Sequence, residues 1–211
     1  AFLAACVAVL QTRYGTTAAA QQSTPDFTHI INQRHTQRLA DLLADAVAKG
    51  AQVRAGGTVD TAGHFIAPTL LEALPPDARI MEEEIFGPIL PVLPYTDLQQ
   101  VIDRINTSPK ALALYVWSRK QPNIDRILTH TSSGGVCINH CMVHVAHANL
   151  PFGGVNNSGI GNAHGIFGFK AFSHERGVLR AGMLPTIKMF FPPYTGLRQR
   201  IVGFLIKLLA R

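Results

Sequence analysis

Residues 112–139 read LALYVWSRKQPNIDRILTHTSSGGVCIN, and this stretch decides the fold. Its first part, residues 112–117, is a short apolar and aromatic run that predicts a buried strand. A helical pattern follows over residues 122–130, and a second strand is expected over residues 135–139. Strands joined through a helix usually pair in parallel, so the stretch predicts an α/β fold with a mostly parallel sheet.

The residues before this stretch continue the alternation of helix and strand. Their apolar spacing predicts helices over residues 1–13 and 29–49, and Asp97 caps another that runs to about residue 106. The remaining segments are expected to be strands, over residues 52–55, 65–71 and 89–95. Pro91 and Pro94 limit the last of these to an edge or a bulged strand.

After Asn139 the composition changes, because residues 150–168 contain six glycines. We predict an ordered loop there, with a short helix over residues 162–171 and a terminal strand over residues 177–180. The chain accordingly divides into three segments: an α/β body (1–149), a glycine-rich loop with the terminal strand (150–185), and a basic tail (186–211).

The distribution of charge excludes one class of partner. The net charge is +6, but only 15% of the residues are charged, against about 25% in an average soluble domain. All acidic residues lie at or before Glu175, and seven basic residues follow it. Because the body is nearly neutral and only the tail is basic, we expect no nucleic-acid partner.

The tail predicts a basic amphipathic helix over residues 197–211. Its apolar residues are expected on one face, opposite Arg198, Lys207 and Arg211; they are Leu197, Ile201, Phe204, Leu205, Leu208 and Leu209. Such a helix either packs on its own protein or a partner subunit, which we favour, or makes peripheral contact with an anionic membrane surface.

The three cysteines, Cys6, Cys137 and Cys141, are too few for a secreted disulfide framework and indicate a cytoplasmic location. No apolar stretch approaches the roughly 20 residues of a membrane-spanning helix. The apolar N-terminus lacks an initiator Met and a preceding basic stretch, so a signal peptide is disfavoured. We interpret it as a helix already under way in a longer protein.

Residues 137–147 contain five potential metal ligands, two cysteines and three histidines. A zinc site is one interpretation, although their spacing is not that of paired structural ligands. We favour a small buried strand residue at Cys137 and loop or pocket roles for the histidines, and we predict no metal site.

The acidic run in residues 81–88, MEEEIFGP, also has two interpretations. Three adjacent carboxylates are usually a solvated surface. Alternatively, Glu84 is fixed by the Phe-Gly-Pro turn and points into a cleft, where a carboxylate accepts hydrogen bonds from paired sugar hydroxyls. The glycine-rich run in residues 150–161 lacks the spacing of a dinucleotide fingerprint and indicates a tightly packed loop instead.

Taken together, these motifs resemble the C-terminal part of an aldehyde dehydrogenase of the class 3 and coniferyl-aldehyde type. The resemblance also extends to residues 26–47 and so covers nearly the whole chain. The matching motifs are Glu83-Glu84-Ile-Phe-Gly-Pro88, Gly134-Gly135-Val-Cys-Ile-Asn139, Leu150-Pro-Phe-Gly-Gly154, Ser158-Gly159, His164-Gly165 and Phe172-Ser173-His174.

The resemblance implies the chemistry of that family. A cysteine thiolate attacks the aldehyde, the thiohemiacetal passes hydride to NAD or NADP, and water hydrolyses the thioester. By resemblance, Glu84 holds the nicotinamide-ribose hydroxyls and Phe86 packs beside the nicotinamide. Phe152 lines the aldehyde tunnel. The resemblance also implies a homodimer paired through residues 177–180.

The same resemblance implies that much of the enzyme is missing. The family's Rossmann-type region, oxyanion asparagine, general-base glutamate and catalytic cysteine all lie upstream of the position that matches Ala1. Cys6, Cys137 and Cys141 do not match the nucleophile, so we assign no catalytic residue and expect the chain alone to be inactive. A noncatalytic binding or assembly module that retains the fold is the alternative. The pair Asn156-Asn157 replaces an expected initial glycine, which is expected to alter the loop.

Overall fold

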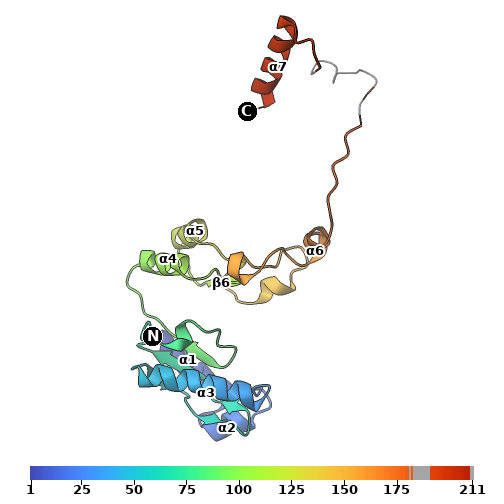
Figure 1. Ribbon diagram of the computed structural model, residues 1–211. Coiled ribbons are helices and arrows are strands. Elements are labelled where there is room, and N and C mark those ends of the chain that lie inside the picture. Colours follow the sequence, from blue (N-terminus) through green and yellow to red (C-terminus); the bar gives the residue numbers. More distant parts are fainter. Residues whose placement is uncertain (181, 183–190, 210–211) are drawn as a thin grey trace. The chain divides into compact units, whose positions relative to one another are not determined.

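The protein is described here by a computed structural model, which covers residues 1–180, 182 and 191–209. The chain divides into two units, Ala1–Val101 and Ile102–Arg211 (Figure 1). Both combine helices with short strands, which confirms the predicted α/β class. Parts of the predicted segments 150–185 and 186–211 lie outside the described residues.

The first unit contains the helices α1 (Phe2–Tyr14), α2 (Ala18–Ser23) and α3 (Gln33–Ala48) and the short 3-10 helix η1 (Arg79–Met81). The prediction placed the start of α3 four residues too early. The helix begins after Asn32, whose side chain accepts a hydrogen bond from the His35 backbone N–H at 2.8 Å and so caps it. The helix α2 was not predicted, although Thr17 caps it in the same way.

The strands of the first unit form two small sheets. β1 (Gln52–Ala55), β4 (Thr69–Glu72) and β5 (Ile89–Pro91) lie in the order β1-β4-β5, and β2 (Val59–Asp60) pairs with β3 (Phe65–Ile66). Only the β4–β5 pairing is parallel, so this unit is mixed rather than mostly parallel.

Two predicted strands are shorter than expected. The strand expected over residues 65–71 is split into β3 and β4 at Ala67-Pro68, and the one expected over residues 89–95 ends at Pro91. Proline has no backbone N–H to donate to a ladder, which accounts for both interruptions.

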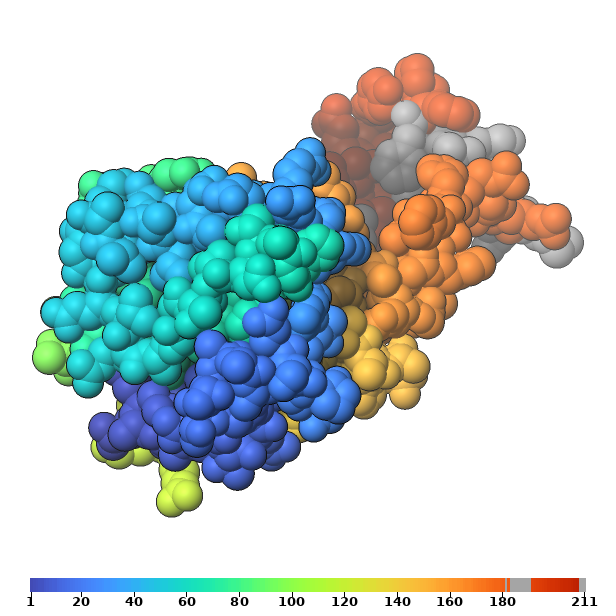
Figure 2. Space-filling model, turned by 90° about the horizontal axis from the view of Figure 1, so that it is seen from below, coloured from blue at the N-terminus to red at the C-terminus, as the bar shows by residue number. Residues whose placement is uncertain are grey.

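One face of α3 provides the core of the first unit. Leu39, Leu42 and Ala46 are fully buried and pack in one cluster with Ile66 and Leu71. Their spacing of three and four residues puts them on one side of the helix. In the space-filling view this unit is a continuous packed body, coloured from blue to green (Figure 2).

The second unit contains the strand, helix and strand predicted from residues 112–139. They are β6 (Ala113–Val116), α5 (Gln121–His130) and β7 (Gly135–Ile138), and β6 pairs with β7 in parallel as expected. Before β6 lies α4 (Leu98–Thr107), whose predicted cap is present because Asp97 accepts from the Gln99 N–H at 3.0 Å. The first strand is less buried than predicted, since Val116 is buried but Trp117 is 67% exposed.

The rest of the second unit consists of η2 (Val143–Ala146), η3 (Asn156–Ser158), α6 (Gly165–Ala171) and α7 (Gly196–Leu209). α6 begins later than the predicted residue 162, because Ala163 pairs with Phe152. The strand predicted over residues 177–180 is not present in this single chain, where Val178 and Leu179 are exposed.

The helix α7 leaves large apolar side chains exposed, among them Leu197, Phe204 and Leu208. The prediction placed Arg198 opposite the apolar face, but Arg198 precedes Ile201 by one helical turn and lies on the same side. Its guanidinium donates to the carbonyl oxygens of Phe191 and Pro193. Within the described residues, no helix is long and apolar enough to cross a membrane.

Candidate functional site

The three carboxylates of the acidic run differ in their partners. Arg79 donates to one oxygen of Glu83 from Nε at 3.0 Å and from Nη2 at 2.8 Å, and Arg38 Nη1 lies 3.6 Å from its other oxygen. Glu82 and Glu84 are exposed, and neither carboxylate has an ion pair within the described part of the chain. Glu84 is therefore available as a hydrogen-bond acceptor, whereas Glu83 is engaged in structure.

Helix α3 anchors the start of this run. Asp45 accepts a hydrogen bond from the Arg79 backbone N–H at 2.9 Å and pairs with Lys49 at 3.1 Å. These contacts, the Arg79 N–H first, lower the pKa of Asp45 below its ordinary value. The hydrogen bonds that Arg79 donates to Glu83 raise the pKa of the Arg79 guanidinium.

The backbone that carries Glu84 is also held from α3. Arg38 donates from Nη1 to the Glu84 carbonyl oxygen at 3.1 Å and from Nη2 to the Ile85 carbonyl oxygen at 2.6 Å. His35 Nε2 lies 3.0 Å from the Phe86 carbonyl oxygen. A carbonyl oxygen only accepts, so Nε2 carries the proton and Nδ1 is free to accept from Arg38 Nε at 3.4 Å.

The hydrogen bonds from Arg38 and His35 to the turn were not predicted, and neither residue was given a role from the sequence. A signal was present, since two polar residues three positions apart share one face of a helix that is otherwise patterned for burial. The carbonyl oxygens that these two side chains contact lie more than 45 residues away along the chain.

Phe86 occupies an unusual position in the turn. Its φ angle is +51°, its side chain is 77% exposed, and its ring meets the His35 ring edge-on with centroids 6.5 Å apart. On the far side of the turn, the Pro88 carbonyl oxygen accepts from the Thr69 N–H at 2.8 Å. The turn is thus held by α3 at one end and by β4 at the other.

A shallow depression of about 490 Å³ lies beside Phe86 and is lined by Ile31, Asn32, Arg34, His35, Arg38 and Phe86. Glu84 is not among its lining residues. One interpretation of the acidic run placed the Glu84 side chain in a cleft. In the single chain this side chain is on the exposed surface.

Phe152 belongs to the second unit and is half-buried in an aromatic cluster. Its ring stacks on His164 with centroids 5.8 Å apart and meets His144 edge-on at 5.4 Å. The Tyr115 ring also meets the His144 ring edge-on, with centroids 5.9 Å apart. His144 is 8% exposed, and neither of its ring nitrogens has a hydrogen-bond partner among the described residues.

The loop after Phe152 is closed too tightly for a side chain at Gly154, where a Cβ would overlap the Ser158 backbone. The Val155 N–H donates to the Ser158 hydroxyl at 2.9 Å and closes the same turn. Asn156 adopts φ +55°, a conformation that asparagine tolerates better than most residues. The asparagine pair is thus accommodated within the loop.

The cysteines and histidines of residues 137–147 do not converge. Cys137 is buried on β7, as predicted, and Cys141 is exposed. Within the described residues, no group of three or more His, Cys, Asp or Glu is placed to hold a metal ion.

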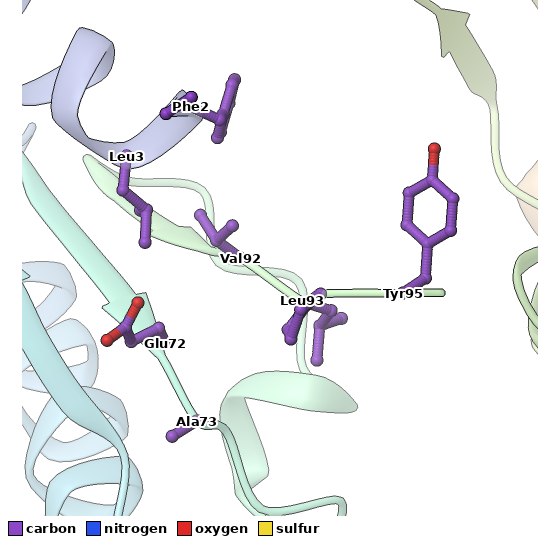
Figure 3. Close-up of a pocket in the computed structure, with 9 residues that line it drawn as sticks. Phe2, Leu3, Glu72, Ala73, Val92, Leu93 and Tyr95 are labelled. Carbon is purple, nitrogen blue, oxygen red and sulfur yellow. The ribbon is translucent and has the colours of Figure 1, made fainter. Parts of the chain in front are cut away.

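A larger hollow in the first unit, of about 690 Å³, is almost entirely apolar. Figure 3 shows Leu3 of α1 pointing toward Val92, and Phe2 and Leu93 are also among its lining residues. Its one carboxylate, Glu72, is paired with Arg54 at 3.2 Å. The predicted site residues Glu84, Phe86 and Phe152 do not line this hollow.

The fold of these units defines the chain as an α/β protein. Hydrogen bonds and close packing hold the turn from Glu83 to Pro88 and the loop after Phe152. Comparison with known sequences then gives its family. The chain belongs to the aldehyde dehydrogenase family, whose sequence profile matches residues 1–178.

Two relatives and two solved structures illustrate the match. Mouse aldehyde dehydrogenase family 3 member A2 is 42% identical over 174 residues, which cover 82% of this chain and 35% of the mouse protein. A protein of Pseudomonas aeruginosa named "Probable coniferyl aldehyde dehydrogenase" is 40% identical over 178 residues, covering 84% and 37%. The predicted likeness to class 3 and coniferyl-aldehyde enzymes is confirmed.

Among solved structures, substrate-bound AldH of Staphylococcus aureus superposes with a TM-score of 0.83 at 37% identity, covering 96% of this chain and 43% of that one. Succinic semialdehyde dehydrogenase of Streptococcus pyogenes, solved with NADP+, has a TM-score of 0.73 at 25% identity, covering 86% and 39%. The chain therefore spans less than half the length of each of these proteins.

Proposed function

We propose that this chain is the C-terminal portion of an NAD(P)-dependent aldehyde dehydrogenase that oxidises aromatic or aliphatic aldehydes to carboxylic acids. Family membership over residues 1–178 and the resemblance to coniferyl-aldehyde enzymes support this proposal. The observation that carries it is the turn from Glu83 to Pro88. There the arginines neutralise Glu83, the backbone is held from α3, and the neighbouring Glu84 carboxylate has no ion pair among the residues that the structure describes.

The residues of this turn fit a nicotinamide cofactor. In our proposal the two carboxylate oxygens of Glu84 accept hydrogen bonds from the two ribose hydroxyls, because an ionised carboxylate is an acceptor only. The exposed Phe86 ring then limits the position of the nicotinamide, and Phe152 forms an aromatic wall for the aldehyde. NAD or NADP supplies the acceptor for the hydride that leaves the aldehyde carbon.

The reacting thiol is expected from a part of the enzyme upstream of Ala1. Cys6 lies within the apolar helix α1, Cys137 is buried, and the exposed Cys141 does not match the nucleophile's position. We therefore expect the 211-residue chain, by itself, to have no dehydrogenase activity.

Turnover of the purified chain tests this proposal. With NAD+ or NADP+ and benzaldehyde or coniferyl aldehyde, we expect no NADH or NADPH above a blank, while circular dichroism verifies the fold. Turnover would overturn the expectation of inactivity. A gene that starts just before Ala1, with no cysteine-bearing half, would contradict the larger enzyme and favour the noncatalytic module.

A homodimer is the second part of the proposal. Val178 and Leu179 are 80% and 98% exposed in the single chain. Among the described residues their backbone has no hydrogen-bond partner, and such backbone is suited to strand pairing between subunits. We expect the larger enzyme to have twice the mass of one subunit by light scattering. The replacement Leu179→Pro removes a backbone donor and is expected to shift the mass toward the monomer.

The third part is peripheral contact of the tail with an anionic membrane surface, by an otherwise cytoplasmic protein with three free thiols. Leu197, Phe204 and Leu208 are 70%, 66% and 58% exposed on α7. No acidic residue follows Glu175, so the charge of this segment complements an anionic surface.

Vesicle sedimentation separates this contact from packing on protein. The chain is expected to sediment with vesicles that contain phosphatidylglycerol, less so with pure phosphatidylcholine. Phe204→Ser with Leu208→Ser should abolish sedimentation. The control, Ile160→Ser with Phe172→Ser, should leave it unchanged, because these side chains are even more exposed but lie outside the tail. Unchanged sedimentation of the tail variant, or a change only in native mass, would contradict membrane contact.

A further inference from the structure

We infer that Arg38 and His35 are positioning residues for nicotinamide binding, acting through the backbone of residues 84–86. This inference rests on the proposed role of Glu84. Neither side chain needs to touch the cofactor. Their role is to fix the direction in which two neighbouring side chains, Glu84 and Phe86, leave the turn.

Three consecutive carbonyl oxygens carry the argument. Those of Glu84, Ile85 and Phe86 all accept from α3, the first two from the two terminal nitrogens of Arg38 and the third from His35 Nε2. A planar guanidinium presents its donors in a rigid fork, so one side chain sets the spacing of two successive peptide groups. Lysine, a single point donor, cannot reproduce this arrangement.

The two positioning residues also depend on one another. His35 Nδ1 faces Arg38 Nε at 3.4 Å, and the Asn32 side chain, at the helix cap, holds the His35 backbone N–H. Arg38 is further oriented by Glu83, whose other oxygen is occupied by Arg79. The N-terminal part of α3 and the acidic run thus form one hydrogen-bonded network.

The backbone conformation of Phe86 explains why the turn requires these hydrogen bonds. A non-glycine residue with φ +51° is unfavourable without support from its surroundings. The His35 contact to its carbonyl oxygen and the Thr69 contact to the Pro88 carbonyl oxygen lie on either side of it. Without the His35 contact, the Phe86 backbone is free to relax, which would redirect the side chains of Glu84 and Phe86.

Hydrogen exchange on the 211-residue chain tests the inference without any activity. Arg38→Lys is expected to speed exchange of the Glu83 and Ile89 amides about tenfold, because they flank the turn: Glu83 donates to the Arg79 carbonyl oxygen before it and Ile89 to the Gly87 carbonyl oxygen inside it. His35→Phe keeps a ring beside Phe86 but removes the donor and should act likewise. Arg54→Lys is the matched control, since its partner Glu72 is at the opposite end of β4 from Thr69, the residue that contacts the turn.

The larger enzyme provides the second readout. Arg38→Lys should raise KM for NAD(P)+ about tenfold while KM for the aldehyde stays within twofold, and His35→Gln, which retains a donor, should restore more affinity than His35→Phe. Unchanged exchange and unchanged cofactor KM in Arg38→Lys would overturn the inference. If exchange rises but Glu84→Gln leaves cofactor KM unchanged, the proposed role of Glu84 fails while the positioning of the turn stands.

Discussion

Gly135 packs directly against the buried ring of His144. A Cβ at position 135 would lie 2.7 Å from Cδ2 and 3.0 Å from Nε2 of that ring. Since the ring is enclosed by Tyr115 and Phe152, it has little room to move away.

The replacement Gly135→Ala is therefore expected to lower the free energy of unfolding by about 1–3 kcal/mol, the usual effect of overpacking. Urea denaturation of the chain measures it. Gly177→Ala, where the added methyl would meet no atom within 4 Å, should change stability little. Equal effects of the two replacements would show that the close contact at His144 is not a constraint.

The loop after Phe152 should be still less tolerant. A Cβ on Gly154 would overlap the backbone of Ser158, which cannot rotate away as a side chain does. We expect Gly154→Ala to displace the loop and change the ring contacts of Phe152 with His144 and His164. Aromatic proton shifts in NMR spectra would report this displacement, and an unaltered spectrum would contradict the tight closure.

The core of the first unit depends on α3. Leu42 is fully buried there, so Leu42→Ala should destabilise the chain by about 2–5 kcal/mol through lost apolar contact and the cavity it leaves. Val47→Ala on the same helix, where the side chain is 44% exposed, serves as the control. Comparable losses in thermal denaturation would argue against the packing of α3 on the sheet.

Acid should weaken the first unit at two carboxylates. Asp60 accepts from the Gly63 N–H at 2.9 Å and from Gln22 at 2.7 Å, and these hydrogen bonds, with Gly63 first, lower its pKa. The pKa of Asp45 is lowered as well, by the Arg79 N–H and Lys49. Because both folded-state values lie below the unfolded one, the stabilisation is present above about pH 4 and is lost as pH falls through the folded-state pKa.

The variant Asp60→Asn should accordingly show a flatter decline in stability between about pH 5 and pH 2 than the wild type. Asp26→Asn serves as the control, because the Asp26 carboxylate has no ion pair within the described residues. A decline in Asp60→Asn as steep as in the wild type would contradict the role of the Gly63 hydrogen bond.

Local patterns predicted those parts of the fold that local forces determine. The strands around α5 and their parallel pairing followed from apolar runs and a helix between them. The errors occurred at single residues that interrupt a pattern. Asn32 caps α3, so the helix begins later than predicted, and Pro68 separates β3 from β4. Burial was overestimated at Trp117, because a strand's sequence does not show how many layers cover it.

The candidate site was less accessible to sequence reasoning for a different reason. The acidic run was visible as a motif, but the distinction between the paired Glu83 and the unpaired Glu84 depends on where Arg79 and Arg38 reach. The bond from Arg38 to Ile85 spans 47 residues, and no local pattern contains it. Likewise, the enclosure of His144 by Phe152 required the folded loop.

Glu84 provides the most direct measurement, made on the larger enzyme to which we propose this chain belongs. Glu84→Gln keeps the size of the side chain but halves its acceptors for the ribose hydroxyls, so KM for NAD(P)+ should rise about tenfold or more. Glu82→Gln, at an exposed position of the same run that likewise has no ion pair in the described part of the chain, should leave KM unchanged. An unchanged cofactor KM in Glu84→Gln, or an equal rise in Glu82→Gln, would contradict the assignment of this turn to the nicotinamide ribose.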